Sequence, residues 1–475
     1  MSLIAYNKIE INTNCGVDVK KYLLLLIAFV AIIGLSACGK TDHVCIDIEK
    51  QQIETEEQKD LANFKPDQSD FYIENANETT VSEHKVVEEN VVEDDIIDNR
   101  YVLLRKASYY KGSIPENKIE KIVFTNEHPE EYDEKWNANE ADTEDIVGYL
   151  HNSTVYIVGE KIRFNQNSRM MFCGVDSYGE EIFSNVKEID GLDIVDTSLV
   201  KNAAYMFAGN KYIKHLDVGG WDVSNVTNMK FMFSGCISIE ELDVENWNVQ
   251  NVEKFTSMFQ GSSHIGDMSL RQIDVSKWNT MSVDSLNHMF YGCGKLEYID
   301  VSNWDVSKVR TFSHMFADCF SLKQLDLSNW KTDRAVSFDA IFNDCKSLKS
   351  IDISNLNTSQ CLQFSQMFES CESLVEIKGI ENLDVSQASN YAFSEMFHNC
   401  KSLTSLDLSK WNTSNADNFA RMFAKCSELK ELNLSGFSLE NAVTMLEMFD
   451  QCPSDLKIIG YENWDLKNID TTNMF

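Results

Sequence analysis

Residues 322–330 read Leu-Lys-Gln-Leu-Asp-Leu-Ser-Asn-Trp. Leu325 and Leu327 alternate with the polar Asp326 and Ser328, which is the period of a strand that is buried on one side. The segment therefore predicts a short strand whose leucines enter a core and whose aspartate faces solvent.

A second segment of the same unit is clearest at residues 223–233, Val-Ser-Asn-Val-Thr-Asn-Met-Lys-Phe-Met-Phe. Val226, Met229 and Phe233 follow one another at intervals of three and four residues. This spacing places apolar side chains on one face of a helix, so it predicts a short helix after each strand.

A Met-Phe pair, once Ile-Phe, marks each copy of this unit. The pairs begin at Met206, Met232, Met258, Met289, Met315, Ile341, Met367, Met396, Met422, Met448 and Met474. Eight of the ten intervals between successive pairs are 26 residues long, and a fixed period of this kind indicates a solenoid. The predicted fold class is α/β, a leucine-rich-repeat-like solenoid with one short parallel strand and one short helix in each 26-residue rung.

Four regions are expected along the chain. Residues 1–37 form a signal peptide, residues 38–100 a lipidated N-terminus with an acidic tether, residues 101–165 a small α/β cap, and residues 166–475 the solenoid. The stretch from Thr41 to Arg100 holds 18 acidic and 5 basic side chains, a composition typical of a disordered spacer. A poorly patterned small domain is the alternative there.

The cap is expected because a solenoid needs an atypical unit to cover its first edge. Short strands are predicted at 102–104, 119–124 and 154–158, where branched and aromatic residues cluster.

The N-terminus carries an export signal. Two lysines precede an apolar run over residues 22–35, which is shorter than the approximately 20 residues of a membrane-spanning helix. Residues 35–39, Leu-Ser-Ala-Cys-Gly, match the bacterial lipobox. That match implies cleavage before Cys38 and a diacylglyceryl group on its sulfur; an uncleaved anchor is the alternative. Val19 is a candidate for the true translation start.

The net charge excludes some partners. The chain of 475 residues has 42 Lys and Arg against 75 Asp and Glu, a formal charge of −33. An acidic surface repels phosphate backbones, so no nucleic-acid partner is expected. The sequence contains no H-E-x-x-H, G-x-S-x-G, Walker or G-x-G-x-x-G motif, so no enzymatic activity and no cofactor beyond the lipid on Cys38 are expected.

Cysteine recurs four residues after the start of most pairs. The members are Cys236, Cys293, Cys319, Cys345, Cys371, Cys400, Cys426 and Cys452. A metal or redox ladder is one interpretation, but no second cysteine or histidine lies at ligand spacing, so no metal site is predicted. Buried packing is the favoured interpretation.

Tryptophan recurs where the strand turns. The members are Trp221, Trp247, Trp278, Trp304, Trp330 and Trp411, with Trp464 close to the same place. An exposed aromatic stripe would suit glycans or a protein partner. A buried ladder is favoured because Leu356 and Phe437 replace tryptophan at the same position.

Aspartate recurs between the two inward residues of the strand. The members are Asp217, Asp243, Asp274, Asp300, Asp326, Asp352 and Asp407, and we take them as the candidate binding face. Neighbouring rungs of a parallel sheet lie about 4.8 Å apart, so adjacent carboxylates repel by about 1 kcal/mol in water. Hydrogen bonds from serine and backbone groups, or bound cations such as calcium or a basic partner, would offset this repulsion.

The string L-D-V-S-x-W-x-V-S-x-V, followed by M-F-x-x-C-x-S-L, resembles the repeat of BspA-type leucine-rich-repeat surface proteins, in the variant found in lipoproteins of mycoplasmas and related Gram-positive bacteria. The resemblance covers residues 119–475, with departures at Ile341, at Lys378 in place of Asp, and at Phe437 in place of Trp. It implies exposure at the cell surface and, in several members, adhesion to host or matrix proteins.

These observations predict an exported lipoprotein, held by its lipid on the outer face of the cytoplasmic membrane, whose solenoid binds a protein ligand that is basic or host-derived. A structural envelope component that binds polysaccharide or cations is one alternative, and a capture subunit of an uptake or degradative complex is another. The sequence stops at Phe475 on a repeat motif, so we expect either a truncated chain or an edge that pairs with another chain.

Overall fold

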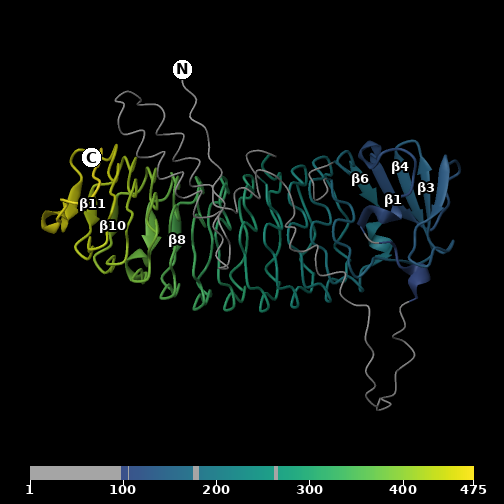
Figure 1. The fold of residues 1–475 in the computed structure, drawn as a ribbon, viewed down its shortest axis with the longest axis horizontal. Helices are drawn as coiled ribbons and strands as arrows, with labels where there is room; N and C mark the ends of the chain where they lie inside the picture. The colour runs from purple at the N-terminus through teal and green to yellow at the C-terminus, as the bar shows by residue number, and fades with distance from the viewer. Residues whose placement is uncertain (1–97, 105, 175–180, 262–265) are drawn as a thin grey trace, which may run out of the picture. The chain divides into compact units, whose positions relative to one another are not determined.

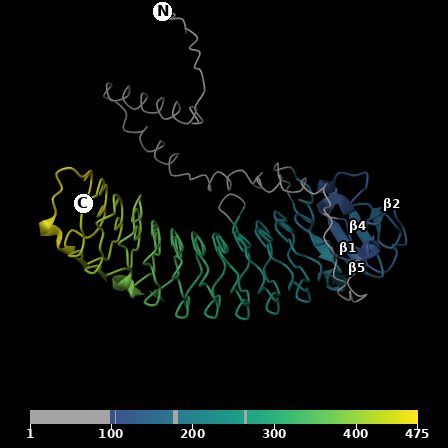
Figure 2. The same cartoon turned by 60° about the horizontal axis from the view of Figure 1, so that its bottom comes forward.

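The computed structural model describes residues 98–104, 106–174, 181–261 and 266–475 (Figure 1). The predicted signal peptide, Cys38 and the tether up to residue 97 lie outside the described residues. All described residues belong to one compact unit. Within that unit a small sheet is followed by rungs that succeed one another along one axis, as the two views in Figures 1 and 2 show.

The small sheet lies at the N-terminal end of the rungs. Its strands are β1 (Lys121–Thr125), β2 (Glu134–Asn137), β3 (Val147–His151), β4 (Thr154–Val158) and β6 (Glu188–Asp190), in the order β2-β3-β4-β1-β6. The pairs β2–β3 and β3–β4 are antiparallel, and β1 pairs in parallel with β4 and β6. Strands β1 and β4 confirm the predictions at 119–124 and 154–158. Because β6 follows the cap in sequence, the sheet continues directly into the rungs.

Shorter strands pair in parallel further along the chain. They are β5 (Ile162–Arg163) with β7 (Val195–Asp196), β8 (Ser350–Asp352) with β9 (Glu376–Lys378), and β10 (Ser405–Asp407) with β11 (Glu431–Asn433) and β12 (Lys457–Ile459). Partners in β8 to β12 are 26 residues apart, so each strand meets its copy in the next rung. In the segment 322–330, Leu325 and Leu327 are buried and Asp326 is exposed, which confirms the predicted alternation.

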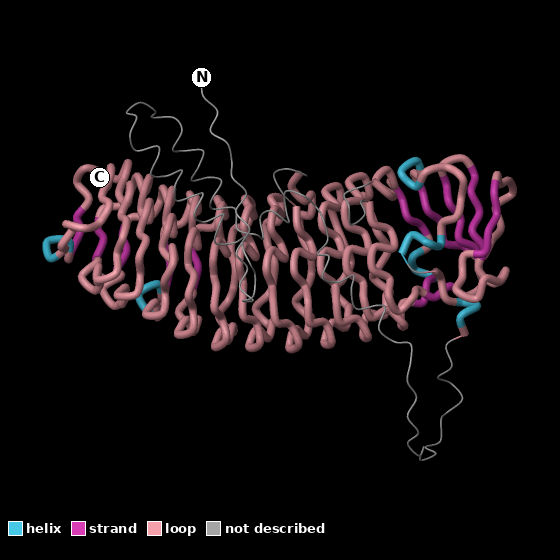
Figure 3. The backbone as a smooth tube through the Cα atoms, in the orientation of Figure 1, coloured by secondary structure: helices cyan, strands magenta, loops and turns pink. Residues whose placement is uncertain are grey.

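The predicted helix in each rung is wrong. In the part of the chain that the structure describes, every helical segment is a 3-10 helix of three or four residues, and Figure 3 draws the rungs almost entirely as loops and turns. The segments are η3 (Asn99–Tyr101), η4 (Lys106–Tyr109), η5 (Glu116–Lys118), η6 (Leu192–Ile194), η7 (Ile380–Asn382) and η8 (Tyr461–Asn463). The predicted strand is also present in only some rungs, since the described residues between 197 and 349, segment 322–330 included, form only isolated parallel bridges. The fold is therefore a coil of turns and extended segments that form short parallel strands in some rungs.

Two successive turns occupy the place of the helix. The amides of Met232 and Ser234 close these turns by donating to the carbonyls three residues earlier, both at 3.1 Å. The amides of Phe231 and Phe233 instead donate to the next rung, to the carbonyls of Thr256 at 3.0 Å and Met258 at 2.9 Å. Alternate backbone donors thus build each rung and join it to its neighbour, so none of these four is left without a partner.

A left-handed residue precedes each Met-Phe pair and prevents a helix from forming. These residues are Tyr205, Phe231, Ser257, His288, His314, Ala340, Gln366, Glu395, Arg421, Glu447 and Asn473, with φ between 49° and 58°. An α-helix requires negative φ at every position. The apolar residues Val226, Met229 and Phe233 are buried as predicted, but turns rather than a helix produce their spacing.

One apolar core runs through the cap and the rungs, from Leu103 to Met474. Its most regular part is a column of stacked phenylalanine rings from Phe172 to Phe475, one in each rung, with ring centroids 5.2 to 6.3 Å apart. Because each ring contacts its copy in the next rung, this column holds the rungs in register and fixes the spacing of the outward strand residues.

Candidate functional site

The aspartates of the predicted binding face point outward on the side of the coil that carries strands β8 to β12, here called the strand side. Five of them are exposed, namely Asp217, Asp243, Asp274, Asp326 and Asp407, while Asp300 and Asp352 are half-buried. Each lies between two buried apolar residues of the strand segment, as the alternation predicted. The face therefore presents a carboxylate in nearly every rung.

Serine and backbone hydrogen bonds hold most of these carboxylates. Oδ1 of Asp274 accepts from the amide of Ser276 at 3.0 Å and from its hydroxyl at 2.7 Å. The same turn recurs at the remaining positions where serine follows two residues later, which are Asp300, Asp326, Asp352 and Asp407. These bonds lower the pKa of Asp274, so its carboxylate is ionised at neutral pH.

The aspartate column is interrupted by a positive charge at Lys378, which occupies the aspartate position of its rung. Lys378 forms an ion pair with Asp352 in the preceding rung, and this contact is the main cause that lowers the pKa of Asp352 to about 2. Further ion pairs join neighbouring rungs on this side, such as Lys323 with Glu297 and Lys457 with Glu431. Lysine therefore neutralises part of this face in several rungs along the coil.

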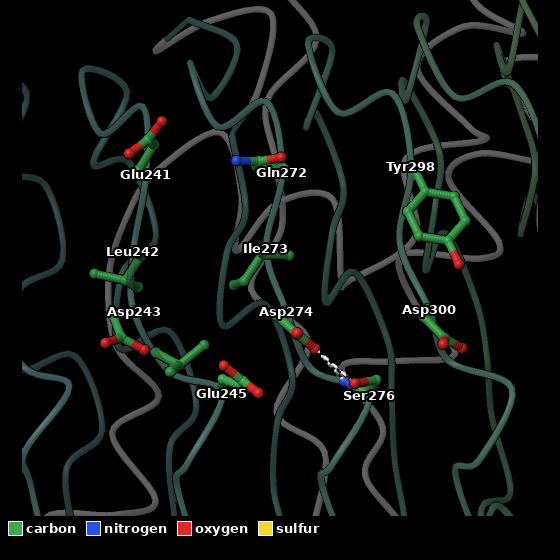
Figure 4. Close-up of a pocket in the computed structure, with 11 residues that line it drawn as sticks. Glu241, Leu242, Asp243, Glu245, Gln272, Ile273, Asp274, Ser276, Tyr298 and Asp300 are labelled. Atoms are coloured by element: carbon green, nitrogen blue, oxygen red, sulfur yellow. Dashed lines mark hydrogen bonds between the residues drawn. The ribbon is translucent and has the colours of Figure 1, made fainter.

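A hollow of about 560 Å³ lies on the strand side across three rungs, 232–257, 258–288 and 289–314 (Figure 4). The lining residues are Glu241, Leu242, Asp243, Val244, Glu245, Gln272, Ile273, Asp274, Ser276, Tyr298 and Asp300. Figure 4 shows Glu241, Gln272 and Tyr298 in one row across the rungs, with the aspartates of the column in a second row beside it. Three residues of the predicted face thus meet at one place.

Sequence reasoning missed Tyr298 and the glutamates of the hollow. Tyr298 is 51 % exposed, although aromatic side chains are usually covered. Glu245 pairs with Lys277, whereas neither Glu241 nor Asp243 has an ion-pair partner within the described ranges. The residue two positions before each aspartate also points outward. An aromatic residue at that second outward position is the sequence feature that marks Tyr298.

The tryptophan column belongs to the core, as predicted. Its members Trp221, Trp247, Trp278, Trp304, Trp330 and Trp411 are buried, and the indole N–H of each donates to a backbone carbonyl of the preceding rung at 2.9 to 3.1 Å. An exposed tryptophan stripe for glycans is therefore excluded for these residues.

The cysteine column is also structural. Each of its eight thiols donates to a backbone carbonyl in the preceding rung, that of the phenylalanine in that rung's Met-Phe or Ile-Phe pair, at 3.1 to 3.3 Å. All are free thiols, and all except the half-buried Cys452 are buried. Burial raises the pKa of Cys345 and its neighbours well above the ordinary value, which keeps them protonated and unreactive.

No metal centre is evident in the described ranges 98–104, 106–174, 181–261 and 266–475, where no three His, Cys, Asp or Glu side chains are arranged to hold an ion. The same part of the chain holds no helix that is both long enough and apolar enough to cross a bilayer.

Three of the solved structures with detectable similarity are leucine-rich repeat proteins. One from Bacteroides ovatus is 17% identical and aligns over 66% of this chain and 86% of its own, with a TM-score of 0.24. One from Eubacterium ventriosum is 13% identical over 57% and 90%, with a TM-score of 0.25. One from Leptospira interrogans is 11% identical over 54% and 62%, with a TM-score of 0.22.

No significant match was found among curated proteins. A family model described as "Mycoplasma protein of unknown function, DUF285" matches residues 179–269, 262–377 and 373–475, more than half of the chain. The protein therefore belongs to the DUF285 family of mycoplasma-type proteins.

Proposed function

We propose that this protein is a lipid-anchored surface lipoprotein whose solenoid binds a basic protein ligand in adhesion to host, matrix or neighbouring cells. The observation that carries the proposal is the hollow, where three aspartates of the repeat meet two further glutamates beside an exposed tyrosine. Stacking of the rungs extends this face over many repeats, which suits a macromolecule.

The chemistry of the hollow favours a cationic group. The pKa of Asp274 is lowered by its serine hydrogen bonds, and Glu241 and Asp243 have no basic side chain paired with them among the described residues. A lysine or arginine of a partner would supply the missing counter-charge, and the ring of Tyr298 would add a cation–π contact. Charge complementarity of this kind raises association rates and selects against acidic partners.

The test compares binding of the mature chain with a variant that changes the hollow. The chain from residue 38, with Cys38→Ser, is passed over immobilised extracellular-matrix proteins, and binding is followed by surface plasmon resonance at several salt concentrations. The variant Glu241→Gln/Asp243→Asn/Tyr298→Ala should bind about tenfold or more weakly, because it loses two charges and the aromatic surface.

A matched control removes two carboxylates of the same strand side far along the coil. Glu376→Gln/Glu431→Gln, at exposed positions of β9 and β11 outside the aspartate column, should retain affinity within about twofold, since only the general field changes. Equal losses in both variants would mean that net charge alone causes binding and would refute the assignment to the hollow.

Lipid attachment is a separate part of the proposal. It rests on the lipobox at residues 35–39 and on the resemblance of the repeat to BspA-type lipoproteins. Cells grown with a labelled fatty acid should label the wild-type protein, and Cys38→Ala should remove both the label and the membrane attachment. A labelled Cys38→Ala protein would contradict the assignment.

The envelope-component alternative predicts a different ligand. If the aspartate column binds calcium, millimolar calcium should raise the melting temperature and a chelator should reverse the rise. If the ligand is a polysaccharide, a glycan array should give binding where matrix proteins give none. A binding role is proposed in preference to an enzymatic one because the sequence contains no H-E-x-x-H, G-x-S-x-G, Walker or G-x-G-x-x-G motif.

A further inference from the structure

Two histidines stack on each other in the paired turns that contain the Met-Phe pairs. His288 and His314 each precede the Met-Phe pair of successive rungs, and both have the left-handed conformation with φ 55°. Their ring centroids lie 4.7 Å apart with an angle of 7° between the ring planes. His288 is 8% exposed, so this face-to-face contact is largely closed to water.

The surroundings supply little counter-charge. Tyr291 contacts both rings edge-on, with centroids 5.6 Å from His288 and 6.2 Å from His314. Nδ1 of His314 is buried without a hydrogen-bond partner among the described residues, and it lies 3.8 Å from a carboxylate oxygen of Asp339, beyond hydrogen-bond distance.

Other charged groups reach the pair only indirectly. Within the same column the neighbours on either side are Ser257 and Ala340, which carry no charge. Asp318 is hydrogen-bonded to Tyr291, and Asp344 with its partner Lys346 lies beyond it. Asp339 is thus the one carboxylate among these groups that faces a histidine of the pair directly.

Both rings are neutral at pH 7. Burial lowers the pKa of His288 to about 3, with a further contribution from the neighbouring imidazole, and burial lowers the pKa of His314 to about 4. Asp339 can compensate one proton on His314, whose side chain is 22% exposed, but a second proton on the buried His288 would place two cations face to face in one stack.

We propose that the His288–His314 stack is an acid-sensitive joint, at which protonation separates the rung of residues 258–288 from the rung of residues 289–314. Two backbone hydrogen bonds join these rungs at this level, from the amide of Leu286 to the carbonyl of Thr311 at 3.2 Å and from the amide of His288 to the carbonyl of Ser313 at 3.0 Å. These bonds open when the rings move apart.

The direction follows from proton linkage. In the opened form both imidazoles return to a pKa near the ordinary value of 6.5, so the open form takes up protons as the pH falls below 6.5. Protonation therefore favours the open form increasingly as the pH falls from about 6.5 to the folded-state pKa of each ring, about 4 for His314 and about 3 for His288. At about pH 4.5 each ring favours the open form by as much as about a hundredfold.

The joint and the hollow share two rungs. Asp274 belongs to residues 258–288, and Tyr298 and Asp300 belong to residues 289–314. Separation of these rungs would change the spacing of the candidate binding face and weaken ligand binding in acid. This consequence rests on the proposed function, whereas the joint itself does not.

The test is hydrogen exchange measured by mass spectrometry on the full chain at about pH 7 and about pH 4.5, corrected for the intrinsic exchange rate. The variant His288→Asn/His314→Asn removes both titrating rings, and asparagine suits this backbone because Asn473 holds the same position with φ 50°. The control is His215→Asn, at an exposed histidine on the strand side.

In the wild type and in the control, a peptide covering residues 286–292, which includes the donating amides of Leu286 and His288, should exchange at least about tenfold faster in acid, while the double variant should show no such increase. An equal increase in the double variant would overturn the proposal. If the double variant fails to fold, labelled histidine spectra of the wild type decide, because a titration of either ring near 6.5 would equally overturn it.

Discussion

The thiol of Cys319 donates a hydrogen bond to the carbonyl oxygen of Phe290 in the preceding rung, with Sγ 3.3 Å from the oxygen. The same carbonyl already accepts from the amide of Cys293 at 3.1 Å, which closes a turn within its own rung. One oxygen thus joins a turn to the next rung. Because the bond from the thiol to a carbonyl of the preceding rung recurs at every cysteine of the column, the thiols act as inter-rung donors in the core.

The first prediction concerns this contact. Cys319→Ala should destabilise the chain by about 1–2 kcal/mol, since it removes a buried donor and leaves a small cavity. Cys452→Ala, at the half-buried end of the column, should cost less than about 1 kcal/mol. Urea unfolding followed by tryptophan fluorescence measures both. A larger loss at Cys452 would contradict a role that depends on burial.

Much of the coil could be predicted because buried positions repeat. The period of 26 residues, the outward aspartates and the buried cysteine and tryptophan columns all follow from side chains whose burial is similar in most copies. Tyr298 could not be recognised in this way, since it is one aromatic residue in a column of mixed polar residues. Only the structure shows that it lines the same hollow as Asp243 and Asp274.

The helix prediction failed for a definable reason. Val226, Met229 and Phe233 fit a helical period, yet two turns of three-residue spacing bury the same side chains. The two turns differ from a helix by the positive φ of Phe231. Residues with bulky side chains rarely have positive φ, so the residue type gives no sign of this conformation. Gly235, with φ 73°, was the one residue in this stretch whose type signals the conformation.

A second prediction tests the tryptophan column by a reciprocal exchange. Nε1 of Trp330 donates to the carbonyl of Val301 at 3.0 Å, so Trp330→Phe should destabilise by about 1–3 kcal/mol through the lost bond and the lost volume. Phe437 lies in the same column between Trp411 and Trp464. Phe437→Trp should therefore fit and stabilise by up to about 1 kcal/mol. Thermal melting of both variants checks the pair, and loss of stability in both would refute the shared geometry.

A third prediction concerns Asp318, whose pKa is raised to about 6 chiefly by burial and next by the nearby Asp344. Because the folded pKa lies above the ordinary value of 3.8, the stability that this group contributes is complete below 3.8 and is lost as the pH rises through about 6. Asp318→Asn should therefore stabilise the chain by about 1–2 kcal/mol above pH 7, after allowance for partial exposure, and by nothing below about pH 4.

The control for this prediction is Asp326→Asn. The backbone and hydroxyl of Ser328 lower the pKa of Asp326, so its ionised form is favoured in the fold and its replacement should not stabilise the chain at any pH. Urea unfolding of both variants across this pH range gives the comparison. A gain for Asp318→Asn that is the same in acid and at neutral pH would show that its charge is not the cause.

The fourth prediction uses the second left-handed position of the rung, just before the cysteine. Lys425 holds φ 61° there with its side chain exposed, whereas glycine occupies the same place at Gly209, Gly235 and Gly292 with φ 70° to 79°. A side chain at positive φ costs roughly 1 kcal/mol, part of which is recovered against the greater freedom of glycine in the unfolded chain. Lys425→Gly should thus stabilise by about 0.5 kcal/mol, while Lys425→Ala, which keeps the Cβ atom, should change stability little. If alanine gained as much as glycine, loss of the lysine charge rather than relief of the backbone would be the cause.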